Sequence, residues 1–368
     1  MISAGDPSAR IWKRVILFFS CEPGGAEMLI PAIRSVMTNT THKVIVLAYG
    51  LGVERFSAKG IECIAIDPIR EHDSSLINTY HPDLIISSAT SLPERDMSEK
   101  HLWRNARNAG IPTMAFLDQW QNYVQRFSGV TDVDRLAFMP DYINCINATG
   151  KSDLLNVGFN RDMLIEFGHP YLSSLDGIAA DLDVASVRKR LGIEPAQKLA
   201  LFASEAIREH FGGARGYDQY DALRVFMNML TTSSVKYKAL IKLHPKDVHE
   251  EYQRILREYS NLMPVIVHNQ ANSVECIQIA DCVCGMTSIM LIEAFVLGKP
   301  VVSIQPGLRV EDSMVLSRMG YLNTIVDANH LPRLEVALAF KSSERPFDFE
   351  FKEKKFLAFL DEKISELP

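Results

Sequence analysis

Asp281–Ile304 reads DCVCGMTSIMLIEAFVLGKPVVSI, and this stretch decides the fold. The short apolar run Asp281–Cys284 predicts a strand, Ser288–Leu297 predicts a helix, and Pro300–Ile304 predicts a second strand. Two short strands joined by a helix form a βαβ unit with parallel strands and a right-handed crossover. The stretch therefore predicts a parallel sheet covered by helices.

The same alternation of strands and helices extends upstream through the second half of the chain. Apolar runs predict three more strands, at Lys198–Ala203, Tyr237–Leu243 and Val265–His268. Helical patterns separate them, near Val184–Leu191, Tyr217–Met229, Val248–Glu258 and Ser273–Ile279. Strands that are apolar throughout are typical of a parallel sheet buried on both faces.

The first half of the chain repeats this organisation with its own strands. They are expected at Arg14–Ser20, Lys43–Ala48, Ile61–Ile66, Asp83–Ser87, Pro112–Leu117 and Tyr142–Ile146. Helices are expected at Gly24–Met37 and Glu94–Asn108, and an amphipathic helix at Phe349–Leu367.

The predicted fold class is therefore α/β, with two doubly wound Rossmann-like domains facing a central cleft. The first domain is expected at residues 1–168, a linker at 169–183 and the second domain at 184–346. Residues 347–368 would pack back on the first domain. Ligands of open α/β sheets bind outside the carboxyl ends of the strands, so the loops that follow the strands are where a site is expected.

Composition excludes several classes of protein. The 368 residues contain 39 Lys and Arg against 45 Asp and Glu, a net charge of −6 that gives no reason to expect nucleic-acid binding. The six cysteines are scattered, which favours buried thiols over a disulfide framework or a metal site. We expect a cytoplasmic protein, because Met1–Arg10 lacks a secretory signal and no apolar run is long enough for a transmembrane helix.

Two stretches of the second half carry candidate ligand-binding groups. Thr287 or Ser288 would cap the helix after Asp281–Cys284, where free N–H groups and the helix dipole favour an anion such as a phosphate. Glu293, about one and a half turns further, could accept hydrogen bonds from a ribose diol. In Ala203–His210, Ser204 could donate to a phosphate and Arg208 could pair with it through a bidentate fork.

Two stretches of the first half follow predicted strands. Gly24 and Gly25, after the first strand, allow a tight turn and close approach of a ligand, but no GxGxxG fingerprint is present. The second stretch, Phe116–Phe127 (FLDQWQNYVQRF), supplies polar and aromatic groups for a sugar. Its candidates are Asp118 as a general base and Trp120, Tyr123 and Arg126 as a binding platform.

The second-half motifs resemble those of GT-B glycosyltransferases and UDP-N-acetylglucosamine 2-epimerases. Glu293 and Leu297-Gly298-Lys299-Pro300 match the family's nucleotide-sugar segment, although Thr287-Ser288-Ile289 departs from its usual Ser-Gly-Gly turn. Ile241–Asp247 (IKLHPKD) looks like the Lys-x-His-Pro signature of CDP-glycerol glycerophosphotransferases. That resemblance implies that His244 acts near the nucleotide phosphates.

The first half is similar to the Gly-rich loop of 3-deoxy-manno-octulosonic acid (Kdo) transferases, where a Gly-x-Glu carboxylate is the general base. Gly25-Ala26-Glu27 matches it, so Glu27 and Asp118 remain rival candidates for the base. Gly168-His169-Pro170 looks like the Gly-x-Pro at which GT-B chains cross between domains.

The resemblance implies an inverting glycosyltransferase that moves a sugar or polyol phosphate from a nucleotide-activated donor to a glycan or lipid-linked acceptor. Such a transfer would serve the synthesis of a surface polysaccharide or glycoconjugate. No cofactor or metal ion is expected, and the absence of a membrane span leaves peripheral membrane association open. The alternatives are a nucleotide-sugar 2-epimerase and a non-catalytic sugar-binding subunit. UDP, CDP, GDP and CMP donors all remain open.

Overall fold

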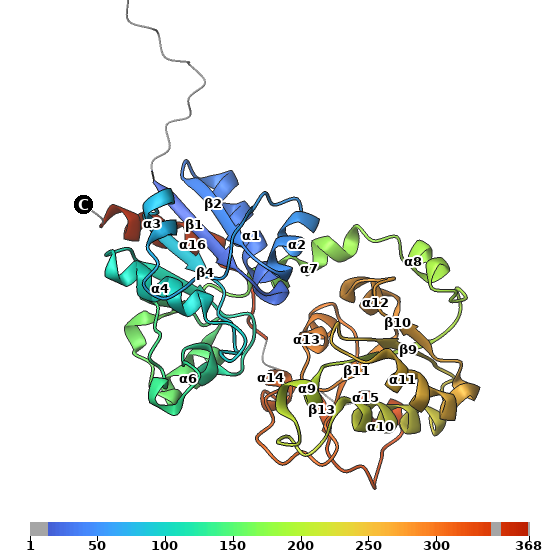
Figure 1. Ribbon diagram of the computed structural model, residues 1–368. Helices are drawn as coiled ribbons and strands as arrows, with labels where there is room; N and C mark the ends of the chain where they lie inside the picture. The colour runs from blue at the N-terminus through green and yellow to red at the C-terminus, as the bar shows by residue number, and fades with distance from the viewer. Residues whose placement is uncertain (1–13, 340–346, 367–368) are drawn as a thin grey trace, which may run out of the picture. The chain divides into compact units, whose positions relative to one another are not determined.

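The computed structural model describes residues 14–339 and 347–366 (Figure 1). They form two compact units, each built around its own sheet. Unit 1 consists of the described residues of Met1–Ser174 and Asp348–Pro368, and unit 2 is formed by those of Leu175–Phe347.

Unit 1 contains a seven-stranded sheet in the order β3-β2-β1-β4-β5-β6-β7, with every neighbouring pair parallel. Its strands are β1 (Val15–Ser20), β2 (Lys43–Ala48), β3 (Ile64–Ala65), β4 (Leu84–Ser87), β5 (Thr113–Phe116), β6 (Tyr142–Asn144) and β7 (Leu164–Ile165). Its helices are α1 (Pro23–Asn39), α2 (Leu51–Ala58), α3 (Ser75–Tyr80), α4 (Ser98–Asn108), α5 (Tyr123–Arg126), α6 (Ala148–Val157) and α16 (Glu353–Ser365). The strand order reverses between β1 and β4, and a crevice at the carboxyl ends of such strands is a common ligand site.

Unit 2 contains a six-stranded parallel sheet in the order β10-β9-β8-β11-β12-β13. Its strands are β8 (Leu199–Ala203), β9 (Lys238–Lys242), β10 (Val265–Val267), β11 (Cys282–Gly285), β12 (Val301–Ile304) and β13 (Asn323–Ile325). Its helices are α8 (Val184–Arg190), α9 (Ile207–Phe211), α10 (Gln219–Thr231), α11 (His249–Leu256), α12 (Ser273–Ile279), α13 (Ile289–Val296), α14 (Val315–Arg318) and α15 (Leu334–Leu338). The order reverses between β8 and β11. The two sheets confirm the predicted α/β class with two doubly wound Rossmann-like domains.

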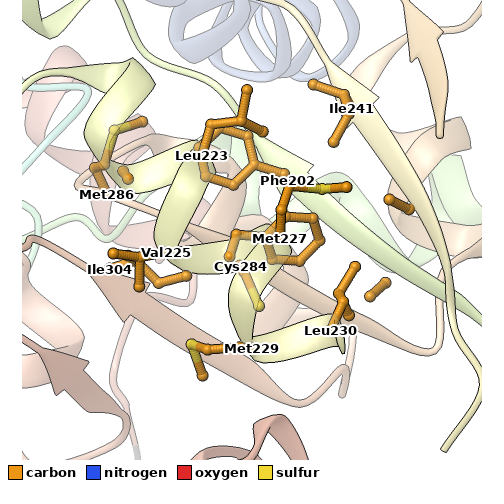
Figure 2. Packing of buried hydrophobic residues seen from close by; sticks show 14 of the residues in the cluster. Phe202, Leu223, Val225, Met227, Met229, Leu230, Ile241, Cys284, Met286 and Ile304 are labelled. Carbon is orange, nitrogen blue, oxygen red and sulfur yellow. The ribbon is translucent and has the colours of Figure 1, made fainter. Parts of the chain in front are cut away.

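The core of unit 2 explains why these strands are apolar throughout. Phe202 of β8 and Cys284 of β11 pack against Leu223 and Met227 of α10, as Figure 2 shows, and all four side chains are fully buried. The thiol of Cys284 is thus part of a packed interior, and none of the six cysteines forms a disulfide.

Helix α7 (Pro170–Ala180) runs through residue 174, where the chain passes from unit 1 to unit 2. Most of the predicted linker is thus helical. The chain returns at residue 348, and α16 lies among the N-terminal elements of unit 1 (Figure 1). Phe356 of α16 is fully buried, with its ring 5.6 Å from that of Phe116 and 5.5 Å from that of Phe167.

Among the described residues, no helix is both long and apolar enough to cross a lipid bilayer.

Candidate functional site

A pocket of about 150 Å³ opens in unit 1 at the point where the strand order reverses. The loops after β1, β4 and β5, the start of α1 and α5 form its walls. The residues that line it are Glu22, Gly24, Gly25, Ser88, Ala89, Thr90, Ser91, Leu92, Asp118 and Arg126. Hydroxyl groups, two carboxylates and one guanidinium are the groups that would bind a polyhydroxylated ligand.

Two glycines allow the pocket to form. A Cβ at Gly25 would overlap the side chain of Ser88 and lie 2.7 Å from Ser20 Oγ, and one at Gly24 would lie 3.0 Å from Asp118 Oδ2. At position 25 only glycine therefore lets the start of α1 approach the loop after β4 so closely. The structure brings together Gly24, Gly25, Asp118 and Arg126, four of the residues chosen from the sequence.

Asp118 lies in the pocket wall with an ion pair to Arg126. The distance between Arg126 Nη1 and Asp118 Oδ1 is 2.7 Å, and the Asp118 side chain keeps 25% of its surface exposed. Arg126 is only 4% exposed, and its Nε donates to the carbonyl of Gln121 at 3.0 Å. A fixed carboxylate that solvent and ligands can reach is the group that a general base requires.

His169 holds the loop that carries Asp118. Its Nδ1 accepts from the backbone N–H of Leu172 at 3.2 Å, so the ring proton is on Nε2, which donates to the carbonyl of Asp118 at 3.0 Å. Burial lowers the pKa of His169 to about 4, so the imidazole is neutral at neutral pH. His169 therefore helps to position the loop that carries Asp118.

A buried carboxyl group, Glu99 of α4, lies behind the pocket. Its Oε1 is hydrogen-bonded to Ser88 Oγ, and its Oε2 accepts from the backbone N–H of Thr90. Desolvation raises the pKa of Glu99 despite these hydrogen bonds. The neighbouring Lys100 is equally buried, and its Nζ donates to the carbonyl of Thr90 at 3.0 Å.

A count of the available protons fits a protonated Glu99. Ser88 Oγ lies 2.7 Å from Ser20 Oγ as well as next to Glu99, and Ser20 Oγ donates to the carbonyl of Glu22 at 3.2 Å. If Glu99 donates its proton to Ser88, then Ser88 donates to Ser20 and every contact contains one proton. The chain of hydrogen bonds from Glu99 thus supports the pocket wall.

We expect Glu99→Gln to preserve the stability of unit 1 and Glu99→Ala to reduce it by about 1–3 kcal/mol, because alanine leaves buried polar groups unpaired. Above the ordinary carboxyl range the unfolded chain loses its proton first, while the folded protein keeps it. The free energy of unfolding of the wild type should therefore fall with rising pH relative to Glu99→Gln, by at most about 1.4 kcal/mol per pH unit. Urea unfolding at pH 5 and pH 8 measures both effects. If Glu99→Gln and Glu99→Ala lost equal free energy of unfolding, the proton on Glu99 would not be the source of the stability.

Glu27, the other candidate base, lies on α1 but not in the pocket wall. Its Oε1 is 3.0 Å from Arg55 Nη1 and 3.7 Å from Lys59 Nζ, basic groups at and just after the end of α2. Both candidate bases are thus ion-paired, and they differ in that Asp118 lines the pocket and Glu27 does not.

The predicted aromatic platform is wrong for Trp120 and Tyr123. Trp120 is 2% exposed, its Nε1 donates to Asn147 Oδ1 at 2.9 Å, and its ring stacks on His169 at 5.9 Å. Tyr123 is 8% exposed and donates to Asp153 Oδ2 at 3.2 Å. Both rings are packed beside α6, because their polar ends find partners there, and neither lines the pocket.

In unit 2, the loops after the adjacent strands β8 and β11 meet. The Glu205 carboxylate accepts from the backbone N–H of Thr287 at 2.9 Å and from Thr287 Oγ1 at 2.8 Å. Arg215 Nη1 donates to Thr287 Oγ1 at 3.1 Å. Ser288 Oγ caps α13 by accepting from the backbone N–H of Met290 at 3.3 Å.

The remaining predicted groups of unit 2 lie on the loop after β8, on α9 and on α13, and several of them have protein partners. Ser204 is buried and hydrogen-bonded to Tyr252. Arg208 Nε donates to Asp218 Oδ2 at 2.9 Å, and its guanidinium lies 4.4 Å from the ring centre of Tyr220. Glu293 is buried on α13, 3% exposed.

His244 follows β9 and is neutral at neutral pH. Burial, followed by the positive charges of His210, Lys246 and Lys242, lowers its pKa to about 4. Its Nδ1 accepts from the backbone N–H of Lys246 at 3.1 Å, which leaves the proton on Nε2. His244 can therefore donate one hydrogen bond to a ligand but adds no charge.

The Leu-Gly-Lys-Pro segment has a structural role in this chain. Gly298 has a φ of +71°, and Lys299 Nζ donates to the carbonyls of Gln278 and Ala280, both at 2.9 Å. Lys299 thus ties the turn after α13 to the end of α12. Among the described residues, no cluster of three or more His, Cys, Asp or Glu side chains could hold a metal ion.

Four residues of these sites were not predicted from the sequence: Glu205, Arg215, Glu22 and Ser88. Glu205 lies inside the predicted stretch Ala203–His210, and Arg215 follows two glycines in Gly212–Gly216. A basic residue in a Gly-rich loop was an available signal for Arg215. The contact between Glu205 and Thr287 spans 82 residues of chain and has no local signal.

No family model matches the chain, and no curated protein matches it in sequence. Solved structures resemble it closely in fold. UDP-GlcNAc 2-epimerase from Neisseria meningitidis, bound to UDP-GlcNAc, aligns with a TM-score of 0.63 and 13% identity over 95% of this chain and 100% of that one. The same enzyme from Methanocaldococcus jannaschii aligns with a TM-score of 0.65 and 12% identity over 95% of this chain and 99% of that one.

A glycosyltransferase from Rickettsia africae is equally similar, with a TM-score of 0.63 and 12% identity over 96% of this chain and all of that one. Identity this low shows the fold alone. The chain therefore has the fold of GT-B glycosyltransferases and UDP-GlcNAc 2-epimerases along almost its whole length.

Proposed function

We propose that the protein is an inverting glycosyltransferase that uses a nucleotide-activated sugar or polyol phosphate. The pocket of unit 1 would bind the acceptor, and Asp118 would take the proton of the attacking hydroxyl. The observation that carries this proposal is the partly exposed Asp118 carboxylate, fixed by Arg126 in a pocket lined with hydroxyl groups.

Unit 2 would bind the nucleotide part of the donor. The loops after β8, β9 and β11 offer a neutral His244 donor, the Thr287–Ser288 turn and Arg215, and Glu293 on α13 would take the ribose. Hydrogen-bond donors and a buried guanidinium can stabilise the charge that develops on a departing phosphate without a metal ion. The acceptor would be a growing surface polysaccharide or glycoconjugate.

A nucleotide-sugar 2-epimerase is the second candidate. Two of the structures compared above are UDP-GlcNAc 2-epimerases, and one of them contains UDP-GlcNAc. The pocket also has a second carboxylate, Glu22, and inversion at a ring carbon requires groups that remove and return a proton.

A thermal-shift screen with nucleoside mono- and diphosphates and their sugar conjugates tests the shared part of both candidates. A ligand that binds only the folded protein raises the midpoint temperature of unfolding. At a concentration one hundred times its Kd, the ligand stabilises the folded state by about 2.7 kcal/mol. We expect at least one nucleotide to shift the midpoint at millimolar concentration. If no nucleotide of the panel shifted the midpoint, the proposed donor site would be wrong, and both enzymatic candidates would fall with it.

The products then separate the two reactions. A transferase releases the free nucleotide and needs an acceptor, whereas an epimerase interconverts two nucleotide sugars with no acceptor present. Chromatography of the nucleotide fraction, with and without a glycan or lipid-linked acceptor, distinguishes them. Nucleotide binding with neither product would instead indicate a non-catalytic sugar-binding subunit.

A further inference from the structure

The position at which a phosphate was expected in unit 2 is taken by a carboxylate of the protein itself. Glu205 Oε2 accepts from the backbone N–H of Thr287, and both carboxylate oxygens lie within 2.9 Å of Thr287 Oγ1. The N–H and hydroxyl groups of Thr287, two residues before α13, are therefore already paired with a negative charge.

Arg215 shows that this arrangement is a built network. Its side chain is nine-tenths buried, its Nη1 donates to Thr287 Oγ1, and its guanidinium lies 4.0 Å from the ring centre of Phe211. Arg215 and Glu205 thus reach the same threonine from two loops. A cation and an anion fixed around one hydroxyl leave little net charge for an incoming phosphate.

The Glu205 side chain is only half-buried, and it comes from the loop between β8 and the short helix α9. It can therefore leave Thr287 more readily than the nine-tenths buried Arg215 can. Movement of Glu205 would expose the Thr287 N–H and restore the positive field of Arg215. A ligand phosphate bound beside an unmoved Glu205 would instead meet a like charge at close range.

We propose that Glu205 is a specificity-determining residue that competes with the phosphates of the ligand for Thr287 and Arg215. This inference rests on the proposed nucleotide site of unit 2. Glu205 would weaken the binding of every nucleoside diphosphate, and it would not affect the uncharged nucleoside. Tight binding would then need further contacts that repay the displacement of Glu205, such as those to an attached sugar.

Isothermal titration with three ligand pairs tests the proposal: UDP and uridine, CDP and cytidine, GDP and guanosine. In Glu205→Gln the amide keeps the size and one acceptor of the carboxylate but removes its charge. We expect the Kd of the bound diphosphate to fall about tenfold or more, and that of its nucleoside to change less than twofold. This gain in diphosphate affinity should be smaller at 1 M salt, where the Debye screening length is about 3 Å.

Glu209→Gln is the matched control, because Glu209 lies on the same segment and accepts from Gln219 Nε2 at 2.8 Å without touching Thr287. It should change diphosphate binding less than twofold. Glu205→Ala should strengthen diphosphate binding as Glu205→Gln does. If Glu205 only supports the loop, both Glu205 variants will weaken the diphosphate and the nucleoside alike, and the proposal is overturned.

The same titrations separate failure of the inference from failure of the proposed function. If a diphosphate binds the wild type and Glu205→Gln equally, the nucleotide site stands and the competing role of Glu205 is wrong. If no diphosphate binds the wild type or either Glu205 variant, unit 2 has no site for these nucleoside diphosphates and the inference falls with it.

Discussion

Replacing Gly168 with alanine is expected to lower the free energy of unfolding of unit 1 by about 2–4 kcal/mol. Gly168 has a φ of +88°, and a Cβ there would overlap the carbonyl oxygen of Glu350 and lie 2.9 Å from that of Phe349. The left-handed backbone costs about 1 kcal/mol, and forced overlap in packed surroundings costs about 1–3 kcal/mol or more. Because the overlapping atoms are backbone, no side-chain rotation can relieve the clash.

Urea unfolding followed by tryptophan fluorescence measures this loss, since Trp103 and Trp120 belong to unit 1 and the sequence of unit 2 contains no tryptophan. A second glycine of unit 1 separates the two causes. Gly158 has a φ of +108° but open space around a Cβ, so Gly158→Ala should show the backbone cost alone. A Gly168→Ala loss no larger than that of Gly158→Ala would contradict the predicted clash.

Replacing Asp118 with asparagine is expected to reduce turnover by about 10²- to 10⁴-fold, the contribution of a positioned general base. Asparagine keeps the size and one acceptor oxygen of the side chain but cannot take a proton. Nucleotide binding should survive, because the proposed donor site lies in unit 2. Turnover with the substrate identified by product analysis, together with nucleotide titration, checks both parts.

Glu27→Gln is the competing variant in the same assay. Because Glu27 does not line the pocket that contains Asp118, we expect a much smaller loss than in Asp118→Asn. If Glu27→Gln lost turnover and Asp118→Asn kept it, the assignment of the base would be reversed. A joint loss of turnover and nucleotide binding in Asp118→Asn would indicate unfolding instead of lost chemistry.

Strands with a continuous apolar run and helices with a clear cap could be predicted from the sequence. Lys43–Ala48 and Ser273–Ile279 appear with the expected bounds, because a strand buried on both faces and a capped helix each leave a local pattern. The strands β7 and β13 were not predicted. They have two and three residues. The equally short β3 and β10 were predicted because they lie within the longer apolar runs Ile61–Ile66 and Val265–His268.

The site was predicted less completely, because side-chain partners depend on contacts between distant parts of the chain. The pocket glycines and Asp118 could be found, since they follow strands directly. The burial of Trp120 could not, because its partner Asn147 lies on another loop. An aromatic residue near a strand end looks the same in sequence whether it faces a ligand or another helix.

The path of the chain through the two units has a consequence for synthesis on the ribosome. Unit 1 is interrupted at residue 174 and resumes only at 348, so all of unit 2 is made before α16 emerges. Until then Phe116 and Phe167 lack the ring of Phe356 that covers them. The nascent first unit therefore waits with an uncovered apolar surface while the second folds, and such surfaces are what chaperones bind.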